Sequence, residues 1–120
     1  MKKLTFILTI SLFTLTNAFS QSFVSPIGFV ESEPNKEKVI SFIKKQVKDD
    51  YSAIGMDDPL TLRMMEQENL KAFKELTSVS NTALLREVIK TYCEIGMCNY
   101  TTILMMYKEQ NKSSKESLEW

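Results

Sequence analysis

Apolar side chains recur every three or four residues along much of the chain, in four segments separated by polar breaks. This spacing places them on one side of a helix. We therefore expect helices at about 35–50, 59–77, 82–95 and 99–111. Their apolar stripes are, in chain order, Val39, Ile40, Ile43 and Val47; Leu62, Met65, Ala72, Phe73 and Leu76; Leu84, Leu85, Val88, Tyr92 and Ile95; Tyr100, Ile103, Leu104 and Tyr107. Because no short helix can bury its stripe alone, the pattern predicts a small all-α bundle of three to four short helices.

Residues that begin and end helices fall at the boundaries of these segments. Prolines suit the first turn of a helix, short polar side chains suit the position before it, and glycine suits the left-handed position after it. The residues in question are Pro34 and Pro59 for the first turns, Asp58, Ser80 or Asn81, and Asn99 for the caps, and Gly96 for the end of the third helix.

The helical domain predicted for residues 35–111 is flanked by segments without helical period. Residues 21–34 form an extended N-terminal arm, with Phe23, Ile27 and Phe29 as the side chains that would hold it against the helices. Residues 112–120 are polar and form a flexible tail.

The first twenty residues have the composition of a cleaved secretory signal peptide. Lys2 and Lys3 precede an apolar, uncharged run over residues 4–15, and small residues, Ala18 and Ser20, stand three places and one place before a cut after Ser20. The run is shorter than the roughly 20 apolar residues that span a membrane. We expect cleavage and export to the periplasm or the extracellular space, with retention as a membrane anchor as the alternative.

Charge and histidine content limit the classes of function. The chain has 15 basic and 15 acidic residues, and loss of Lys2 and Lys3 leaves 13 and 15, a net charge of −2. This is not the basic footprint of a nucleic-acid-binding protein. The chain has no histidine, the commonest general base and metal ligand. An enzyme that uses Tyr51, Asp57 or Asp58 is the least supported hypothesis, and we expect no cofactor.

Cys93 and Cys98 are the only cysteines. In an unbroken helix their Cα atoms would be about 8–9 Å apart, beyond the roughly 7 Å that a disulfide spans. Gly96 between them ends the helix and removes this obstacle. We expect a structural disulfide across this turn, with a redox-active pair or free buried thiols as alternatives.

Methionine is frequent, and its sulfur is a soft ligand. Met97 lies beside Cys98, so Cys93, Met97 and Cys98 could form a Cu(I) site in a periplasmic metal-binding protein. The main interpretation is that no metal binds, because methionine is also an ordinary filler of irregular helical cores.

Three apolar residues lie away from the predicted core stripes: Met64, Leu70 and Met105. They are candidates for contact with another envelope or secreted protein. We therefore expect a non-enzymatic exported protein of the inhibitor, immunity or accessory type.

Asn69 lies in the middle of the apolar face of the second helix. A buried amide must find hydrogen-bond partners or lower the stability of the fold. We expect it to bond a neighbouring helix or the 50–58 loop, with partial exposure or a ligand contact as alternatives.

Overall fold

The computed structural model of the protein describes residues 22–120 and confirms the all-α fold. Four helices follow one another: α1 (Glu33–Ser52), α2 (Pro59–Leu76), α3 (Thr82–Glu94) and α4 (Tyr100–Ser113). This part of the chain contains no strand. The predicted signal peptide lies outside the described residues.

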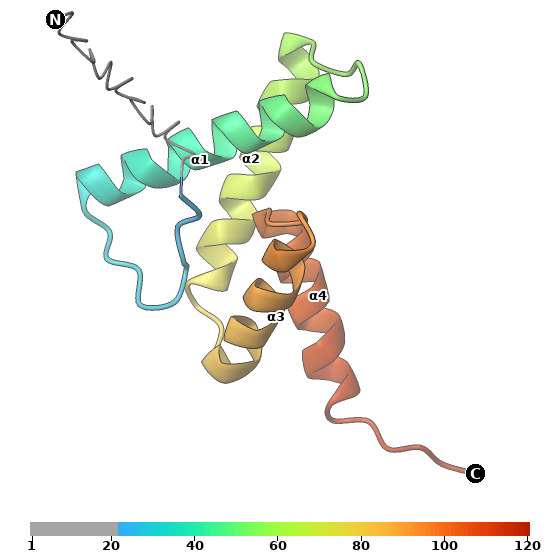
Figure 1. Ribbon diagram of the computed structural model, residues 1–120. Helices are drawn as coiled ribbons and strands as arrows, with labels where there is room; N and C mark the ends of the chain where they lie inside the picture. Colours follow the sequence, from blue (N-terminus) through green and yellow to red (C-terminus); the bar gives the residue numbers. More distant parts are fainter. Residues whose placement is uncertain (1–21) are drawn as a thin grey trace, which may run out of the picture.

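The helices pack in an order that differs from their order in the chain. α1 crosses α2, α2 packs on α4, and α4 packs on α3 (Figure 1). The connected ends of α1 and α2 project from the rest of the domain as a hairpin (Figure 1). α2 and α4 therefore form the middle of the bundle.

Each helix begins at a polar residue whose side chain accepts a hydrogen bond from a backbone N–H three residues later. The four acceptors are Ser32 (3.3 Å), Asp58 (3.0 Å), Asn81 (3.2 Å) and Asn99 (2.8 Å). These bonds satisfy N–H groups that have no partner inside the helix. The predicted caps of α2, α3 and α4 are confirmed.

Two helices are longer than their predicted ranges. α1 begins at Glu33 because Ser32 caps it, and Pro34 occupies its first turn. α4 continues to Ser113, so the helix includes the first two residues of the predicted tail. The residues that these extensions add lie in helical turns at the surface.

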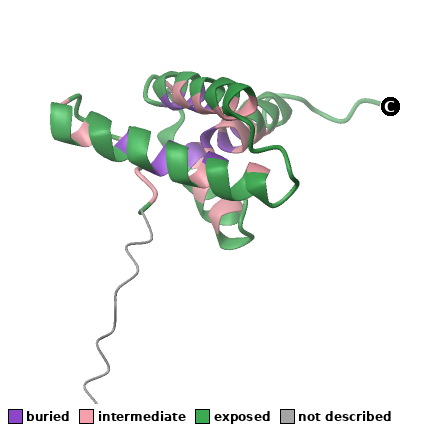
Figure 2. Ribbon diagram, turned by 90° about the horizontal axis from the view of Figure 1, so that it is seen from above, coloured by how far each residue is buried: buried purple, intermediate pink, exposed green. Residues whose placement is uncertain are grey.

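The buried faces of the helices meet in one core, and their outer faces are exposed (Figure 2). The core comprises Val39, Phe42, Ile43, Val47, Ala72, Phe73, Leu76, Leu85, Val88, Tyr100, Ile103 and Tyr107. Ile40 was predicted to share the buried stripe of α1, but it is 40% exposed. It lies at the margin of the stripe and lines a hollow between α1 and α2.

The arm that precedes α1 is part of the packed structure. Phe23, Ile27 and Phe29 pack against the core as predicted, and Pro26 is fully buried. The ring of Phe23 lies 5.6 Å from that of Phe42. The arm therefore closes one side of the bundle.

Tyr100 joins the arm to three helices. Its ring centroid lies 5.2 Å from Phe23, 5.5 Å from Phe42 and 4.9 Å from Phe73. Its hydroxyl donates a hydrogen bond to the Val24 carbonyl oxygen at 2.7 Å. Burial raises the pKa of Tyr100 well above its ordinary value of 10.0.

The raised pKa makes stability depend on pH in the alkaline range. The unfolded tyrosine ionises near pH 10 and the folded one does not, so its contribution is complete below pH 10 and is lost as the pH rises further. Between pH 8 and pH 11 the wild type should lose about 1.4 kcal/mol more unfolding free energy than Tyr100→Phe. Denaturant titrations at both values measure this, with Tyr51→Phe as the control. Equal losses in wild type and Tyr100→Phe would contradict it.

Candidate functional site

The turn between α3 and α4 contains the predicted disulfide. Cys93 and Cys98 are joined, and their Cα atoms lie 4.1 Å apart. Gly96 has a φ of +78°, and the N–H groups of Gly96 and Met97 donate to the carbonyl oxygens of Cys93 and Tyr92. This is the Schellman pattern of helix ends, in which glycine takes the left-handed position. Glycine and disulfide together reverse the chain.

The same bond bears on the alternative Cu(I) site. Both sulfurs of Cys93 and Cys98 are bonded to each other, so neither is a thiolate that could bind metal beside Met97. Within residues 22–120 no three Cys, Asp or Glu side chains group as a metal site would require. A copper site here would first need reduction of the disulfide.

Tyr51, Asp57 and Asp58, the residues of the enzyme hypothesis, lie at the turn of the α1–α2 hairpin. The Asp58 carboxylate accepts hydrogen bonds from the backbone and the hydroxyl of Thr61, and these bonds lower its pKa. Asp57 accepts from the Ser52 hydroxyl at 3.3 Å, and Tyr51 packs against the core. Their positions are explained by the turn between α1 and α2.

The three apolar residues predicted to bind a partner do not form one patch. Met64 and Met105 are 54% and 57% exposed, whereas Leu70 is half-buried and packs against the core. The prediction that Leu70 lies away from the core is therefore wrong in part. Met105 lines a hollow between α2 and α4, and Leu70 faces α1. Only Leu70 is part of an apolar recess between α1 and α2.

This recess, the α1–α2 groove, is the candidate site. It has two compartments, of about 270 Å³ and 160 Å³, which share Ile40 and Leu70. The larger compartment is completed by Phe29 and Phe73, and the smaller by Ile43. The two compartments are therefore neighbours, with Ile40 and Leu70 at their common boundary.

Charged side chains surround the apolar floor of the groove. The cations are Lys36, Lys44 and Lys74, and the anions are Glu31 and Glu66. Glu66 is paired with Arg63, whose Nε lies 2.9 Å from its carboxylate. Lys36 is likewise paired with Glu33, whose carboxylate lies 3.4 Å from its Nζ. Lys44 and Lys74 then stand against Glu31, so the rim is weakly positive.

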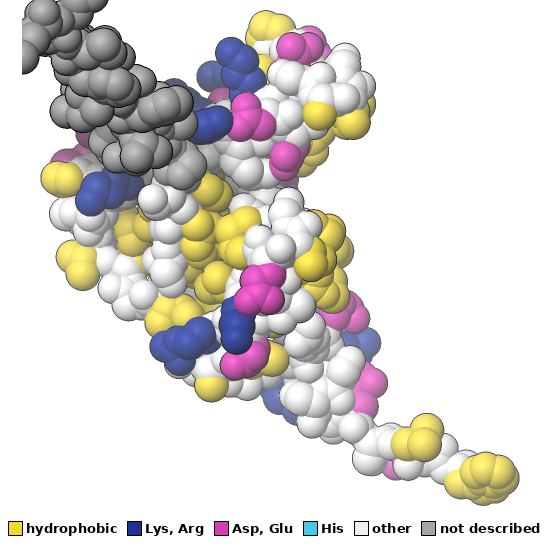
Figure 3. Space-filling view, in the orientation of Figure 1, with side chains coloured by type: hydrophobic (Ala, Val, Ile, Leu, Met, Phe, Trp, Pro, Cys, Tyr) yellow, Lys and Arg dark blue, Asp and Glu magenta, His cyan; other side chains and the backbone are white. Residues whose placement is uncertain are grey.

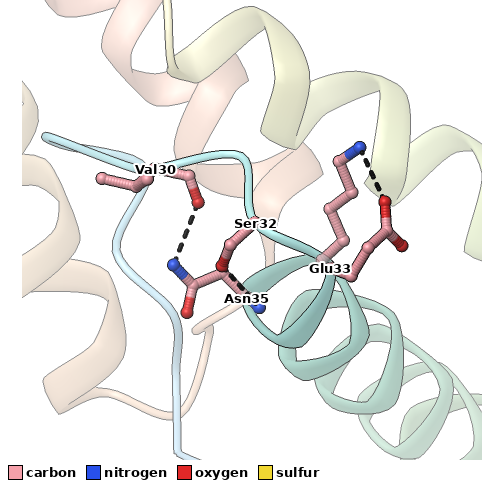
Figure 4. Close-up of polar contacts among 5 residues, drawn as sticks. Val30, Ser32, Glu33 and Asn35 are labelled. Atoms are coloured by element: carbon pink, nitrogen blue, oxygen red, sulfur yellow. Dashed lines mark hydrogen bonds and ion pairs between the residues drawn. The ribbon is translucent and has the colours of Figure 1, made fainter.

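The arm supplies one wall of the groove, and polar contacts fix that wall to α1 (Figure 4). The Asn35 amide nitrogen donates to the Val30 carbonyl oxygen at 3.0 Å, and the Asn35 backbone N–H donates to the Ser32 hydroxyl. The Phe29 ring then packs edge-on against Phe73 at 4.9 Å. The wall is thus built by a local turn and one aromatic contact.

Two residues of the groove, Ile40 and Phe29, were not predicted from the sequence to be binding residues. Ile40 had been assigned to the core, although its position at the edge of the stripe was a signal of partial exposure. Phe29 was predicted to touch the helices, but nothing in the sequence indicated that its contact would form a recess.

A second exposed apolar group lies at the end of the α1–α2 hairpin. It comprises Ile54, Met56, Leu60 and Met64. This end projects from the rest of the domain (Figure 1). The groove is the more selective surface.

Asn69 is buried, with 3% of its surface exposed. Its Nδ2 donates to the Met65 carbonyl oxygen at 2.9 Å, one turn earlier in α2. Among the described residues its Oδ1 has no hydrogen-bond partner. The expected bond to another helix or to the 50–58 loop is therefore wrong, since the side chain bonds within its own helix.

None of the helices in residues 22–120 combines the length and the apolar character that crossing a membrane requires.

Comparison with known proteins finds no family model, no curated protein and no solved structure that matches this chain. A function has to be argued from the geometry and chemistry of its own residues.

Replacing both cysteines by serine should lower the free energy of unfolding by about 2 kcal/mol, since a short loop restrains the unfolded chain only modestly. Denaturant unfolding of the Cys93→Ser, Cys98→Ser double variant measures this. A reductant should destabilise the wild type equally and leave the double variant unchanged. Identical transitions for wild type and double variant would contradict the prediction.

Asn69→Leu should raise the free energy of unfolding by about 1 kcal/mol, because it removes a buried oxygen without a partner and keeps a side chain of similar size. Thermal or denaturant unfolding measures the change. Asn69→Ala, which removes the same oxygen but leaves a cavity, is the comparison and should be less stable than the leucine variant. A leucine variant less stable than wild type would contradict this prediction.

Proposed function

We propose that this is an exported protein that acts by binding another protein, as an inhibitor, an immunity-type protein or an accessory subunit. Three features support export: the signal-like composition of residues 1–20, the disulfide between Cys93 and Cys98, and the modest size of the domain. Small domains in oxidising compartments often use a disulfide to supplement a limited core.

The α1–α2 groove is the observation that carries the binding proposal. Two neighbouring hollows floored by aromatic and aliphatic side chains offer apolar surface to a partner, and concave apolar surfaces are where ligands and partners commonly bind. Ile40 and Leu70 lie where the compartments join, so a partner's apolar side chain would be desolvated there. Buried apolar anchors of this kind supply most of the affinity of protein interfaces.

The rim of the groove gives the expected partner a charge preference. Lys44 and Lys74 stand around the apolar floor, while Lys36 is paired with Glu33 and Glu66 with Arg63. A partner with acidic residues beside its apolar anchors would therefore associate faster and in a preferred orientation. Its binding should weaken at high salt because the lysines are at the surface.

Leu70→Asp should abolish capture of the partner, because a carboxylate at the junction of the compartments would be desolvated by the anchor. The tagged protein, expressed from its full-length sequence in its own host, is recovered from the envelope fraction and its co-purifying proteins are quantified. Thr91→Asp places the same charge on an exposed residue of α3 outside the groove and should retain the partner. Circular dichroism checks that both variants are folded.

Equal capture by wild type and Leu70→Asp would show that the groove is not the binding surface. Absence of any stoichiometric partner in the wild-type sample would count against a protein-binding function altogether.

A further inference from the structure

Residues 117–120, in the segment that follows α4, carry two apolar side chains that the rest of the protein does not cover. Leu118 and Trp120 are the most exposed large apolar residues of the described chain, at 102% and 121% of their reference areas. Figure 3 shows hydrophobic side chains at the end of this tail, away from the body of the protein. Exposure of a tryptophan in this manner leaves a large apolar surface in water.

An extended tail would present its two apolar side chains on one face. In an extended segment, residues two apart point to the same side and lie about 7 Å from each other. Leu118 and Trp120 are such a pair, with Glu119 between them. The groove offers two adjacent compartments of unequal size, about 270 Å³ and 160 Å³, that meet at Ile40 and Leu70.

The charges are also complementary. Residues 114–120 carry Glu116 and Glu119 against one cation, Lys115, and so have a net charge of −1. In an extended segment the Glu116 side chain points to the same side as Leu118 and Trp120, and Glu119 points to the other side. Lys36 and Lys74 line the larger compartment and Lys44 lines the smaller one. Glu31 is the anion of the rim that has no cation within ion-pair distance among the described residues, and it stands on the arm side of the larger compartment.

We propose that the α1–α2 groove binds the tail segment 117–120 of a second copy of this chain, with Trp120 in the larger compartment and Leu118 in the smaller one. This inference rests on the proposed function, because it assigns an occupant to the same groove. It also defines the ligand class: an extended segment with two apolar side chains two residues apart and an acidic residue between them.

A second copy is the better source of the tail than the same copy. In the structure the tail leads away from the helices (Figure 1), and the rest of the protein does not cover its apolar residues. If two copies related by a two-fold axis exchanged their tails, each tail would occupy the groove of the other copy. Each tail buries only two anchors, so the contact is far smaller than the roughly 1,200–2,000 Å² of stable interfaces and self-association should be weak.

Trp120 is the only tryptophan of the chain, which makes the test direct. A peptide of residues 114–120 is titrated with the protein carrying Trp120→Phe, so the peptide holds the only tryptophan in the sample. We expect a blue-shifted emission and a rise in anisotropy, with half-saturation between about 0.1 and 1 mM. Leu70→Asp added to this protein should abolish the change, and Thr91→Asp, on the exposed face of α3, should leave it intact.

Sedimentation equilibrium of the otherwise unaltered protein supplies the second measurement. Dimer should accumulate over the same concentration range, and it should be lost in Leu118→Ser, Trp120→Ser. A monomer at all concentrations, or a dimer that persists in this double variant, would overturn the proposal. A blue-shifted Trp120 emission that does not change with dilution would place the tail in its own groove and would equally overturn it.

The two proposals fail in different ways. If the peptide does not bind but an envelope protein is captured in a Leu70-dependent manner, only the assignment of the tail is wrong. If the peptide binds and no envelope partner is recovered, the groove is a self-association surface and the proposed function is wrong.

Discussion

Tyr100 is the residue through which the elements of this fold are connected. It is the first residue of α4, and its ring contacts Phe42 of α1, Phe73 of α2 and Phe23 of the arm. Its hydroxyl is satisfied by the Val24 carbonyl oxygen, so a polar group is buried without an unpaired donor. Edge-to-face aromatic contacts with this spacing add to the apolar burial of the rings. α1 has little other contact with α4, and the arm has no regular hydrogen bonding of its own.

The groove is a consequence of how the arm is held. α1 and α2 cross, which leaves their side chains uncovered on one side of the crossing. The arm closes part of that side, because Phe29 packs on Phe73 and Asn35 bonds Val30, but it stops short of Ile40 and Leu70. What remains open is a recess with an apolar floor and lysines at its rim. The candidate site is therefore made by tertiary packing and has no sequence motif of its own.

Local features of the fold were predictable from sequence, and features that depend on tertiary contact were not. Asp58, Asn81 and Asn99 cap their helices through bonds to residues three positions later, and Gly96 ends α3 through its left-handed backbone. Periodicity located most core residues for the same reason, but it omitted the buried Phe42 and placed Ile40 and Ile95 on core stripes although they are 40% and 64% exposed. It could not show that Asn69 would bond its own helix, since a helical wheel contains no information about neighbouring partners. The partner contact predicted for Leu70 stays a prediction; that Leu70 is half-buried and lines the groove depends on how α1 crosses α2.

The contact between Tyr100 and Val24 spans 76 positions of the chain. Contacts at such separation form late, because a long loop must be closed before they are gained. A chain that is synthesised or threaded through a pore from its N-terminus exposes Phe23, Pro26 and Phe29 well before α4 emerges. Until then the arm is an uncovered apolar strip, and it becomes part of the domain only when the last helix arrives. The earliest segment of the domain to appear is thus among the last to gain its native environment.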